Sequence, residues 1–187
     1  ADVCGTIVSV GDLVDKSKLG ERVLVEPCIT EARGKKLERP WYFGSECDGG
    51  FAEYTVVAAR HAYEITSSLS DVELASFPCS YSTAENLLTR SKVCSGDVVL
   101  VTGASGGVGS AVIQLAKARG ANVVAITLPA KAAKLKSLGA DHTLTRNDDI
   151  IKELGKNSVD VVIDLVAGSQ WPDLLDVLKC FGKYADA

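Results

Sequence analysis

The chain has 187 residues, of which 47% are hydrophobic and 24% charged, and its formal net charge is −4. The length is enough to bury a hydrophobic core, and no apolar run is long enough to span a bilayer. The acidic balance argues against a nucleic-acid or anionic-membrane binder, because phosphate groups are bound by clustered Lys and Arg. The opening ADVCGTIVSVG has no basic leader before an apolar core, so we expect no signal peptide and a cytoplasmic protein.

Both ends of the sequence have the pattern of interior segments. The first residue is not Met, and the residues after it enter strand-like material at once. The last residues, CFGKYADA, stop where a new strand is expected to begin. We therefore expect the working protein to continue in both directions.

The first third of the chain is β-rich. Short strand-like runs at 5–11 (GTIVSVG), 21–27 (ERVLVEP) and 52–59 (AEYTVVAA) are separated by glycine and charged loops. The polar, Gly-rich segment 28–50 is typical of an excursion loop between strands. Its aromatic cluster, Trp41 to Phe43, either lines a substrate pocket or anchors the loop to the core.

The cysteines and histidines form no metal-ligand spacing. The cysteines show no CxxC pair, and we expect reduced, mostly buried thiols rather than disulfides. They are Cys4, Cys28, Cys47, Cys79, Cys94 and Cys180. His61 and His142 fit surface or packing positions better than catalytic ones.

After residue 70 strands and helices alternate. An Asp-initiated helix is interrupted at Pro78 and followed by a second helical run. The strands that follow are continuous apolar runs, as expected when helices cover both faces of a parallel sheet. The last helical pattern covers 169–182. The predicted fold class is α/β: part of a β-rich domain over 1–66, then an incomplete Rossmann doubly wound parallel sheet over 67–187 with leading linker helices.

Four glycines, at 103, 106, 107 and 109, lie in the loop after a buried strand and in the first turn of the amphipathic helix that follows. The strand Val98 to Val101 leads into the loop, the helix Val108 to Arg119 leaves it, and a second strand, Asn122 to Thr127, completes a βαβ unit. In such a unit the helix start offers unpaired N–H groups and a positive dipole end to an anion. The spacing G-x-x-G-x-x-G is not the commoner dinucleotide motif, and the alternative is a tight turn without a ligand.

We favour the dinucleotide site, because several glycines are costly in a mere connector. Gly106 and Gly107 would let the backbone approach a pyrophosphate, and Gly109 would let helix and strand pack closely. The loop residues predicted to bind the cofactor are Gly103, Ser105, Gly106, Gly107, Val108 and Gly109.

The end of the second strand bears on which nucleotide is bound. NAD sites place an Asp or Glu there, whereas this strand ends with Thr127, followed by Lys131. A hydroxyl and an ammonium favour a 2′-phosphate, and Arg146 after the third strand could add a second cation. Lys131, Lys134 and Lys136 also fit a solvated helix face. We predict NADPH as cofactor, with NADH as the alternative.

The strand, glycine-loop and helix segments described above resemble the medium-chain dehydrogenase/reductase superfamily, and within it the quinone oxidoreductase-like branch. VLVTGASGGVGSAVIQLAKARGANVVAIT is similar to the nucleotide loop of that branch, and KLKSLGADHTL and VDVVIDLVAGSQW to its later strands. GTIVSVGDLVDKSKLGERV and GGFAEYTVV are similar to strands of the family's GroES-like catalytic domain. The resemblance implies a fragment lacking both ends, and that Thr83 lies near the nicotinamide; a hydroxyl bonded to its own helix is the alternative.

The resemblance also bears on zinc. Aligned with zinc-dependent alcohol dehydrogenases, Ala1 takes the place of a ligand His and Asp2 that of a Glu, while Cys79 matches a ligand Cys. Alanine cannot coordinate a metal, and a catalytic zinc needs three protein ligands, so Cys79 is expected to be a buried thiol. Cys28 and Cys47 alone do not fill the tetrahedral site of the family's structural zinc. We expect no zinc.

The expectation is a zinc-independent, NADPH-dependent oxidoreductase that passes hydride to a quinone or an α,β-unsaturated carbonyl, with a homodimer as the full-length form. No side chain stands out as a general acid, so no catalytic residue is assigned beyond the cofactor contacts. Two alternatives stay open: a zinc-dependent alcohol dehydrogenase using Cys79, and a protein of this fold that binds the nucleotide without turnover.

Overall fold

The structure is a computed structural model that describes residues 1–32 and 34–187. It divides into two compact units, 1–79 and 80–187. The predicted domain boundary at residue 66 stays a prediction. Among the described residues, no helix combines the length and the apolar composition that crossing a membrane requires.

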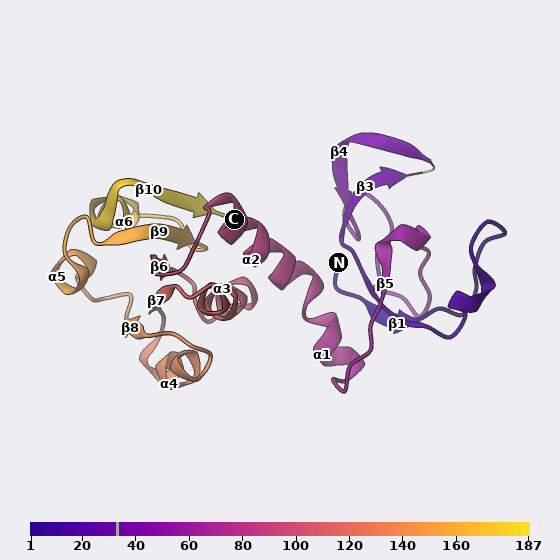
Figure 1. Cartoon of the computed structure of the whole chain (residues 1–187), viewed down its shortest axis with the longest axis horizontal. Coiled ribbons are helices and arrows are strands. Elements are labelled where there is room, and N and C mark those ends of the chain that lie inside the picture. The colour runs from indigo at the N-terminus through magenta and orange to yellow at the C-terminus, as the bar shows by residue number, and fades with distance from the viewer. Residues whose placement is uncertain (33) are drawn as a thin grey trace. The chain divides into compact units, whose positions relative to one another are not determined.

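The first unit is β-rich, as predicted (Figure 1). A three-stranded antiparallel sheet in the order β1–β2–β5 and a separate hairpin, β3–β4, form its described sheets. Its elements in chain order are β1 (Cys4–Thr6), η1 (Lys16–Lys18), β2 (Arg22–Val25), β3 (Cys28–Ala32), β4 (Lys35–Tyr42), η2 (Ala59–His61), β5 (Ala62–Glu64) and α1 (Asp71–Ala75).

The hairpin corrects the expectation of an excursion loop over 28–50; residue 33 lies outside the described residues. Strands β3 and β4 pair from Cys28↔Tyr42 to Ala32↔Lys35. The signal that was overlooked is the spacing of two apolar residues: Leu37 and Trp41, four positions apart on β4, lie on one face and pack against a small core of buried Val25, Ile29 and Phe43. The aromatic cluster therefore anchors this segment through Trp41 and Phe43, while Tyr42 points to solvent.

The strand expected at 52–59 is absent from the described structure, in which this run lies outside every sheet. The third strand of the sheet is instead β5, whose Tyr63 pairs with Leu24 of β2. Phe51, Tyr54 and Val56 are exposed. Residues 52–59 have the β-branched and aromatic composition of a strand. A strand also needs a neighbouring strand that hydrogen-bonds to its backbone, and this run has none among the described residues.

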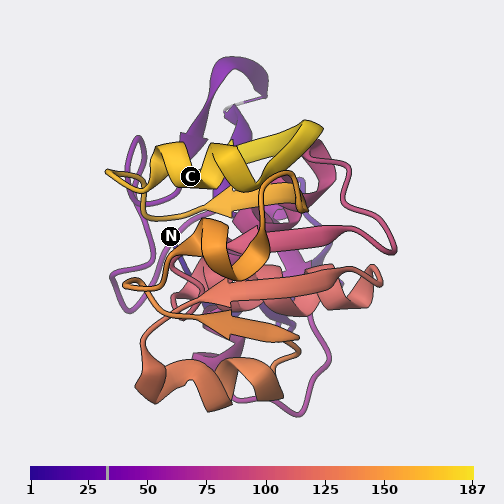
Figure 2. The same ribbon diagram turned by 90° about the vertical axis from the view of Figure 1, so that its left-hand side faces the viewer.

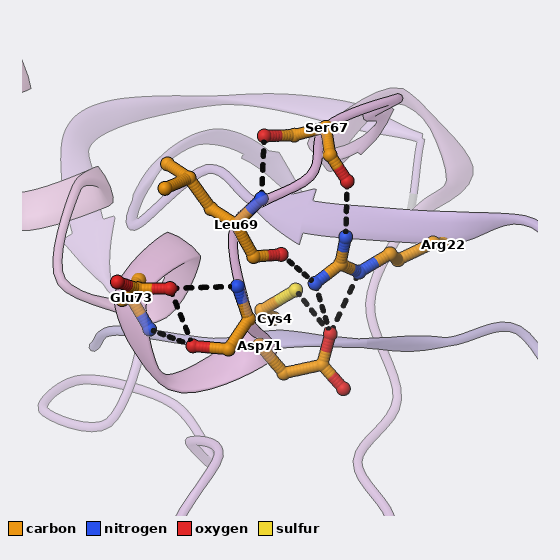
Figure 3. Close-up of polar contacts among 7 residues, drawn as sticks. Cys4, Arg22, Ser67, Leu69, Asp71 and Glu73 are labelled. Atoms are coloured by element: carbon orange, nitrogen blue, oxygen red, sulfur yellow. Dashed lines mark hydrogen bonds and ion pairs between the residues drawn. The ribbon is translucent and has the colours of Figure 1, made fainter.

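Arg22 of β2 ties the segment that leads into α1 to the sheet (Figure 3). Its guanidinium donates to Asp71 Oδ1 at 2.7 Å and to the carbonyl oxygens of Ser67 at 3.1 Å and Leu69 at 2.7 Å. The helix begins with a capping box, in which Ser70 and Glu73 each accept from the other's backbone N–H. The planar guanidinium thus holds three acceptors of one segment in a fixed arrangement.

The second unit is a parallel sheet of five described strands in the order β10–β9–β6–β7–β8, the Rossmann-type arrangement that was predicted. Figure 2 shows these strands side by side. The elements from the linker helix onward are α2 (Pro78–Arg90), β6 (Val98–Val101), α3 (Gly107–Ala118), β7 (Asn122–Ile126), α4 (Pro129–Ser137), β8 (His142–Leu144), α5 (Ile150–Leu154), β9 (Val159–Asp164), α6 (Trp171–Val177) and β10 (Leu178–Asp186).

Helices cover both faces of this sheet, as the continuous apolar strands predicted. Val99 and Val101 of β6 pack on one face with residues of α2 and α3, whereas Leu100 points to the other face. That second face packs against Ile150 of α5 and Leu174 of α6. In Figure 2, α5 lies in front of the strands.

The last helix is shorter than predicted. The pattern over 169–182 indicated one helix, but α6 ends at Val177 and β10 begins at Leu178. The strand pairs with β9 at Leu178↔Val159 and then from Lys183 onward, with an irregularity between them. Gly182 and a left-handed Phe181, at φ 64°, lie in that irregular stretch and do not suit a helix interior.

Candidate nucleotide-binding site

The glycine loop connects β6 to α3, within one residue of the predicted helix start. Gly106 is the N-cap of α3 and, having no side chain, supplies no cap to the helix. Helix geometry leaves the N–H groups of the first turn without intrahelical partners. With the positive end of the helix dipole, these N–H groups make a backbone site for an anion at the end of β6.

Gly103 and Gly109 are required by the protein's own backbone. Gly103 has a left-handed φ of 57°, and a Cβ on it would lie 3.1 Å from Val166 Cγ2. A Cβ on Gly109 would lie 2.6 Å from the Gly103 carbonyl oxygen, a distance that real Cβ contacts do not reach. Gly109 therefore lets α3 approach the loop residues Gly103 and Ala104 closely, whereas close packing against the strand itself was predicted.

Gly106 is different, because nothing in the described chain requires a glycine there. Its φ is −78°, which any residue adopts, and a Cβ on it would meet only the Gly103 carbonyl oxygen at 3.4 Å. The residue is exposed. Gly106 therefore has no steric reason within the described chain, and it leaves the uncapped start of α3 unobstructed by a side chain.

The residues predicted to distinguish NADPH from NADH follow the ends of β7 and β8. Thr127 is 4% exposed, its N–H donates to the Leu144 carbonyl at 2.9 Å, and its Oγ1 has no hydrogen-bond partner among the described residues. Lys131 Nζ lies 3.5 Å from Ser105 Oγ, so the structure brings these two predicted residues together. Arg146 is exposed and lines a pocket with Gly103.

Thr83 lies on α2, half-buried. It is three positions beyond Ser80, which places the two side chains on neighbouring parts of one helix face. Ser80 Oγ lies 2.6 Å from the position that a Cβ on Gly107 would take, and Gln114 of α3 donates to the Tyr81 hydroxyl at 2.8 Å. The start of α2 therefore packs beside the start of α3, on the side of the predicted cofactor loop.

A pocket at the carboxyl end of the sheet contains residues that the sequence reasoning missed. It is lined by Thr102, Gly103, Ile126, Arg146, Asp164, Val166, Ala167, Gln170 and Leu174. Gln170 Nε2 donates to the Arg146 carbonyl at 2.9 Å and so links the loops on either side of the pocket. The signal available in the sequence was an acid closing a buried apolar run, VDVVID, at the edge where ligands of parallel sheets bind.

Asp164 is the buried acid of this pocket. Burial alone would raise the pKa of its carboxyl group, but hydrogen bonds from the Thr102 and Tyr184 hydroxyls and from two backbone amides outweigh it and lower the pKa. The pKa of Tyr184 is raised strongly, by burial and by the neighbouring Asp164 charge. The carboxylate is therefore ionised at neutral pH and the phenol is a hydrogen-bond donor.

The Cys79 N–H donates to Asp2 Oδ1 at 2.9 Å, so these two predicted positions lie side by side. Cys79 is exposed, which contradicts the expectation of a buried thiol, because it lies in the first turn of α2 outside the hydrophobic clusters. All cysteines are free and none is fully buried, so the description "mostly buried" was wrong. No group of three metal-ligating side chains occurs among the described residues, and the absence of zinc stays a prediction.

The two histidines keep the packing and surface roles expected of them. His61 is buried in η2, and its Nε2 has no hydrogen-bond partner among the described residues. His142 opens β8 and is exposed. Lys134 and Lys136 are exposed on α4, which agrees with a solvated helix face.

Comparison with known proteins shows which protein families and relatives this chain is similar to. Residues 1–67 match the alcohol dehydrogenase GroES-like domain and residues 107–185 the zinc-binding dehydrogenase domain. The chain is 36% identical to the chloroplastic NADPH-dependent alkenal/one oxidoreductase of Arabidopsis thaliana, over 88% of this chain and 40% of that protein. It is 32% identical to the quinone oxidoreductase of Rattus norvegicus, over 98% of this chain and 52% of that protein.

Among solved structures, a protein of Sinorhizobium meliloti 1021 crystallised as a candidate alcohol dehydrogenase is 43% identical, with a TM-score of 0.92 over 100% of this chain and 53% of that one. The fold is thus a Rossmann-type sheet preceded by a GroES-like β-rich region. The chain belongs to the medium-chain dehydrogenase/reductase superfamily. It spans about half the length of the curated relatives that it matches.

Proposed function

We propose that this chain is the cofactor-binding part of a zinc-independent, NADPH-dependent oxidoreductase that reduces a quinone or an α,β-unsaturated carbonyl compound. The observation that carries the proposal is the uncapped start of α3 at Gly106, a glycine for which the chain itself has no steric need. The names of the Arabidopsis and rat relatives support the cofactor and the two substrate classes.

The residues present fit a dinucleotide. Backbone N–H groups at the start of α3 would hold the diphosphate bridge, with Gly106 allowing its close approach. Ser105 and Val108 would contribute loop contacts on either side, and Thr83 on α2 would contact the nicotinamide end. The bound cofactor supplies hydride, and the protein orients it and excludes water.

Three residues support NADPH over NADH. The 2′-phosphate would lie among the Thr127 hydroxyl, the Lys131 ammonium and the Arg146 guanidinium, with no carboxylate at the end of β7 to repel it. Phosphate oxygens would accept a hydrogen bond from the Thr127 hydroxyl, which has no partner among the described residues. Lys131, already beside Ser105, needs only a small movement of its flexible side chain to reach the same phosphate.

A fluorescence titration of the full-length protein with NADPH and NADH, followed by a turnover assay with a quinone and an enone, tests the proposal. We expect NADPH to bind more tightly than NADH and to be oxidised only when an acceptor is present. Binding without oxidation with either acceptor would instead favour a nucleotide-binding protein without turnover. Stoichiometric zinc whose chelation abolishes activity would favour the alcohol dehydrogenase alternative using Cys79.

Homodimer formation and a cytoplasmic location remain predictions for the full-length protein. Size-exclusion chromatography with light scattering measures the first. The second is measured by fractionating cells that express the protein from its own gene.

A further inference from the structure

Asp164 is a buried carboxylate, 2% exposed, at the carboxyl end of β9. No Lys or Arg pairs with it among the described ion pairs; four neutral groups donate to it instead. The Thr102 hydroxyl donates to Oδ1 at 2.5 Å, the Val166 and Ala167 amides donate to Oδ1 at 3.1 Å each, and the Tyr184 hydroxyl donates to Oδ2. Leaving a buried charge without hydrogen-bond donors is costly in free energy. Because only neutral groups stabilise this carboxylate, each hydrogen bond to it holds its donor group in place.

The four donors come from three segments that are separate in the sequence. Thr102 is the first residue after β6, at the entrance to the glycine loop. Val166 and Ala167 form the turn after β9, and Tyr184 comes from β10. Thr102 also accepts from the Leu165 amide at 2.9 Å, so its hydroxyl joins both sides of the network. Asp164 thus links three neighbouring strands at one edge of the sheet.

The turn that Asp164 holds forms one wall of the pocket beside the glycine loop. Ala167 adopts a left-handed φ of 58°, an unfavourable conformation for a residue with a Cβ. The turn also packs onto the glycine loop, since Val166 Cγ2 lies 3.1 Å from the Cβ position of Gly103. The hydrogen bonds that the Val166 and Ala167 amides donate to Asp164 stabilise the turn in this conformation.

We propose that Asp164, together with Thr102 and Tyr184, is a positioning residue that holds the pocket wall and the glycine loop in the arrangement needed to bind the dinucleotide. The inference rests on the proposed function. The carboxylate itself acts through these neighbours, because its oxygens are occupied by protein donors and a bare negative charge would repel the phosphates.

Asp160, near the other end of β9, provides a control for Asp164. The Asp160 carboxylate accepts from the Val98 amide at 2.9 Å and from Lys179 Nζ at 2.8 Å, so it links β9 to the start of β6 and to β10. It therefore also joins three strands, but at the amino edge of the sheet, away from the glycine loop. A purely structural role for Asp164 would make the two residues equivalent in their effect on binding.

The test compares Thr102→Val, Tyr184→Phe and Asp164→Asn with Asp160→Asn in the full-length protein. The thermal unfolding midpoint without nucleotide and the Kd for NADPH are measured for each variant. We expect the Kd to rise about tenfold or more in the three network variants and to stay within about twofold of the wild type in Asp160→Asn, at comparable losses of midpoint. Thr102→Ser, which keeps the hydroxyl, should restore the wild-type Kd.

Thr102→Val and Tyr184→Phe each remove one hydroxyl donor and leave the Asp164 carboxylate in place, so they serve if Asp164→Asn does not fold. Network variants with a wild-type Kd, or a Kd that rises equally in Asp160→Asn, would overturn the positioning role while leaving the proposed function intact. A wild-type protein that does not bind NADPH at all would overturn the proposed function first.

Discussion

Replacing Gly106 by Ala separates binding from folding at the glycine loop. The new Cβ would lie 3.4 Å from the Gly103 carbonyl oxygen, an ordinary contact, and the φ of −78° is already favourable for alanine. Alanine is a poorer N-cap by about 0.5 kcal/mol, and the loss of unfolded-chain entropy returns about 0.4–1 kcal/mol. We therefore expect the free energy of unfolding to change by less than about 0.5 kcal/mol.

The same methyl group would occupy the space through which a diphosphate approaches the N–H groups of α3. Charge-assisted hydrogen bonds to those groups need donor–acceptor distances of about 2.7–2.9 Å. We expect the Kd for NADPH to rise at least about tenfold, equivalent to about 1.4 kcal/mol. Isothermal titration calorimetry gives the Kd, and chemical denaturation gives the free energy of unfolding.

Gly109→Ala is the matched control, since it adds the same methyl group three residues away. Its Cβ would lie 2.6 Å from both the Gly103 carbonyl oxygen and the Ala104 Cα, which are backbone atoms and cannot rotate aside. We expect a loss of stability of about 1–3 kcal/mol from this overpacking. If Gly106→Ala binds NADPH like the wild type, or unfolds as readily as Gly109→Ala, the argument that a ligand explains Gly106 is refuted.

Three further predictions concern single residues and pH. Thr127→Val removes a buried hydroxyl that has no partner, so the nucleotide-free protein should gain about 1 kcal/mol in stability while NADPH, but not NADH, binds more weakly; calorimetry with both nucleotides checks this. Arg22→Lys leaves a single ammonium for three acceptors, so amides in 66–70 should exchange hydrogen faster, whereas those of β6 should not. Burial opposes the lowered pKa values of Asp141, Asp160 and Asp164, but hydrogen bonds outweigh it, so their folded pKa lies below the unfolded value of about 4. The stability that these three carboxylates contribute is therefore complete above about pH 4 and is lost as the pH falls through their folded pKa values. A urea unfolding midpoint that stays constant between about pH 6 and about pH 3 would contradict this.

Local patterns predicted most of the second unit, except that its last helix ends at Val177, just before β10 begins. Continuous apolar runs such as Val98–Val101, each followed by a turn and an amphipathic helix, specify a strand with both faces covered and a return crossover. The glycine loop was predicted for the same reason, since strand, loop and helix are contiguous in the sequence. The predicted start of α3 differs from the observed one by a single residue.

The first unit was harder because its strands depend on distant partners. Segment 28–50 looks polar along its length, yet Leu37 and Trp41, four positions apart, bring one face of β4 onto the small core. Segment 52–59 shows the opposite case, with strand-like residues that find no strand to pair with in the described chain. Composition and alternation describe a strand's faces, whereas the hydrogen-bonded neighbour is decided by the fold.

The carboxyl edge of the sheet shows why the site was only partly predictable. Asp160 and Asp164 close the two ends of one apolar run, and nothing in VDVVID distinguishes an acid that ties strands together from one that shapes a pocket. The two acids differ because every strand of a parallel sheet ends at the same edge. Asp164 lies at that edge and meets Thr102 and the glycine loop, whereas Asp160 lies at the opposite edge and meets Val98 and Lys179. Once the strand order β10–β9–β6 is known, the loop after β9 must lie beside the loop after β6. An acid at the end of an inner parallel strand should therefore be treated as a candidate for ordering the neighbouring ligand loop even where it touches no ligand.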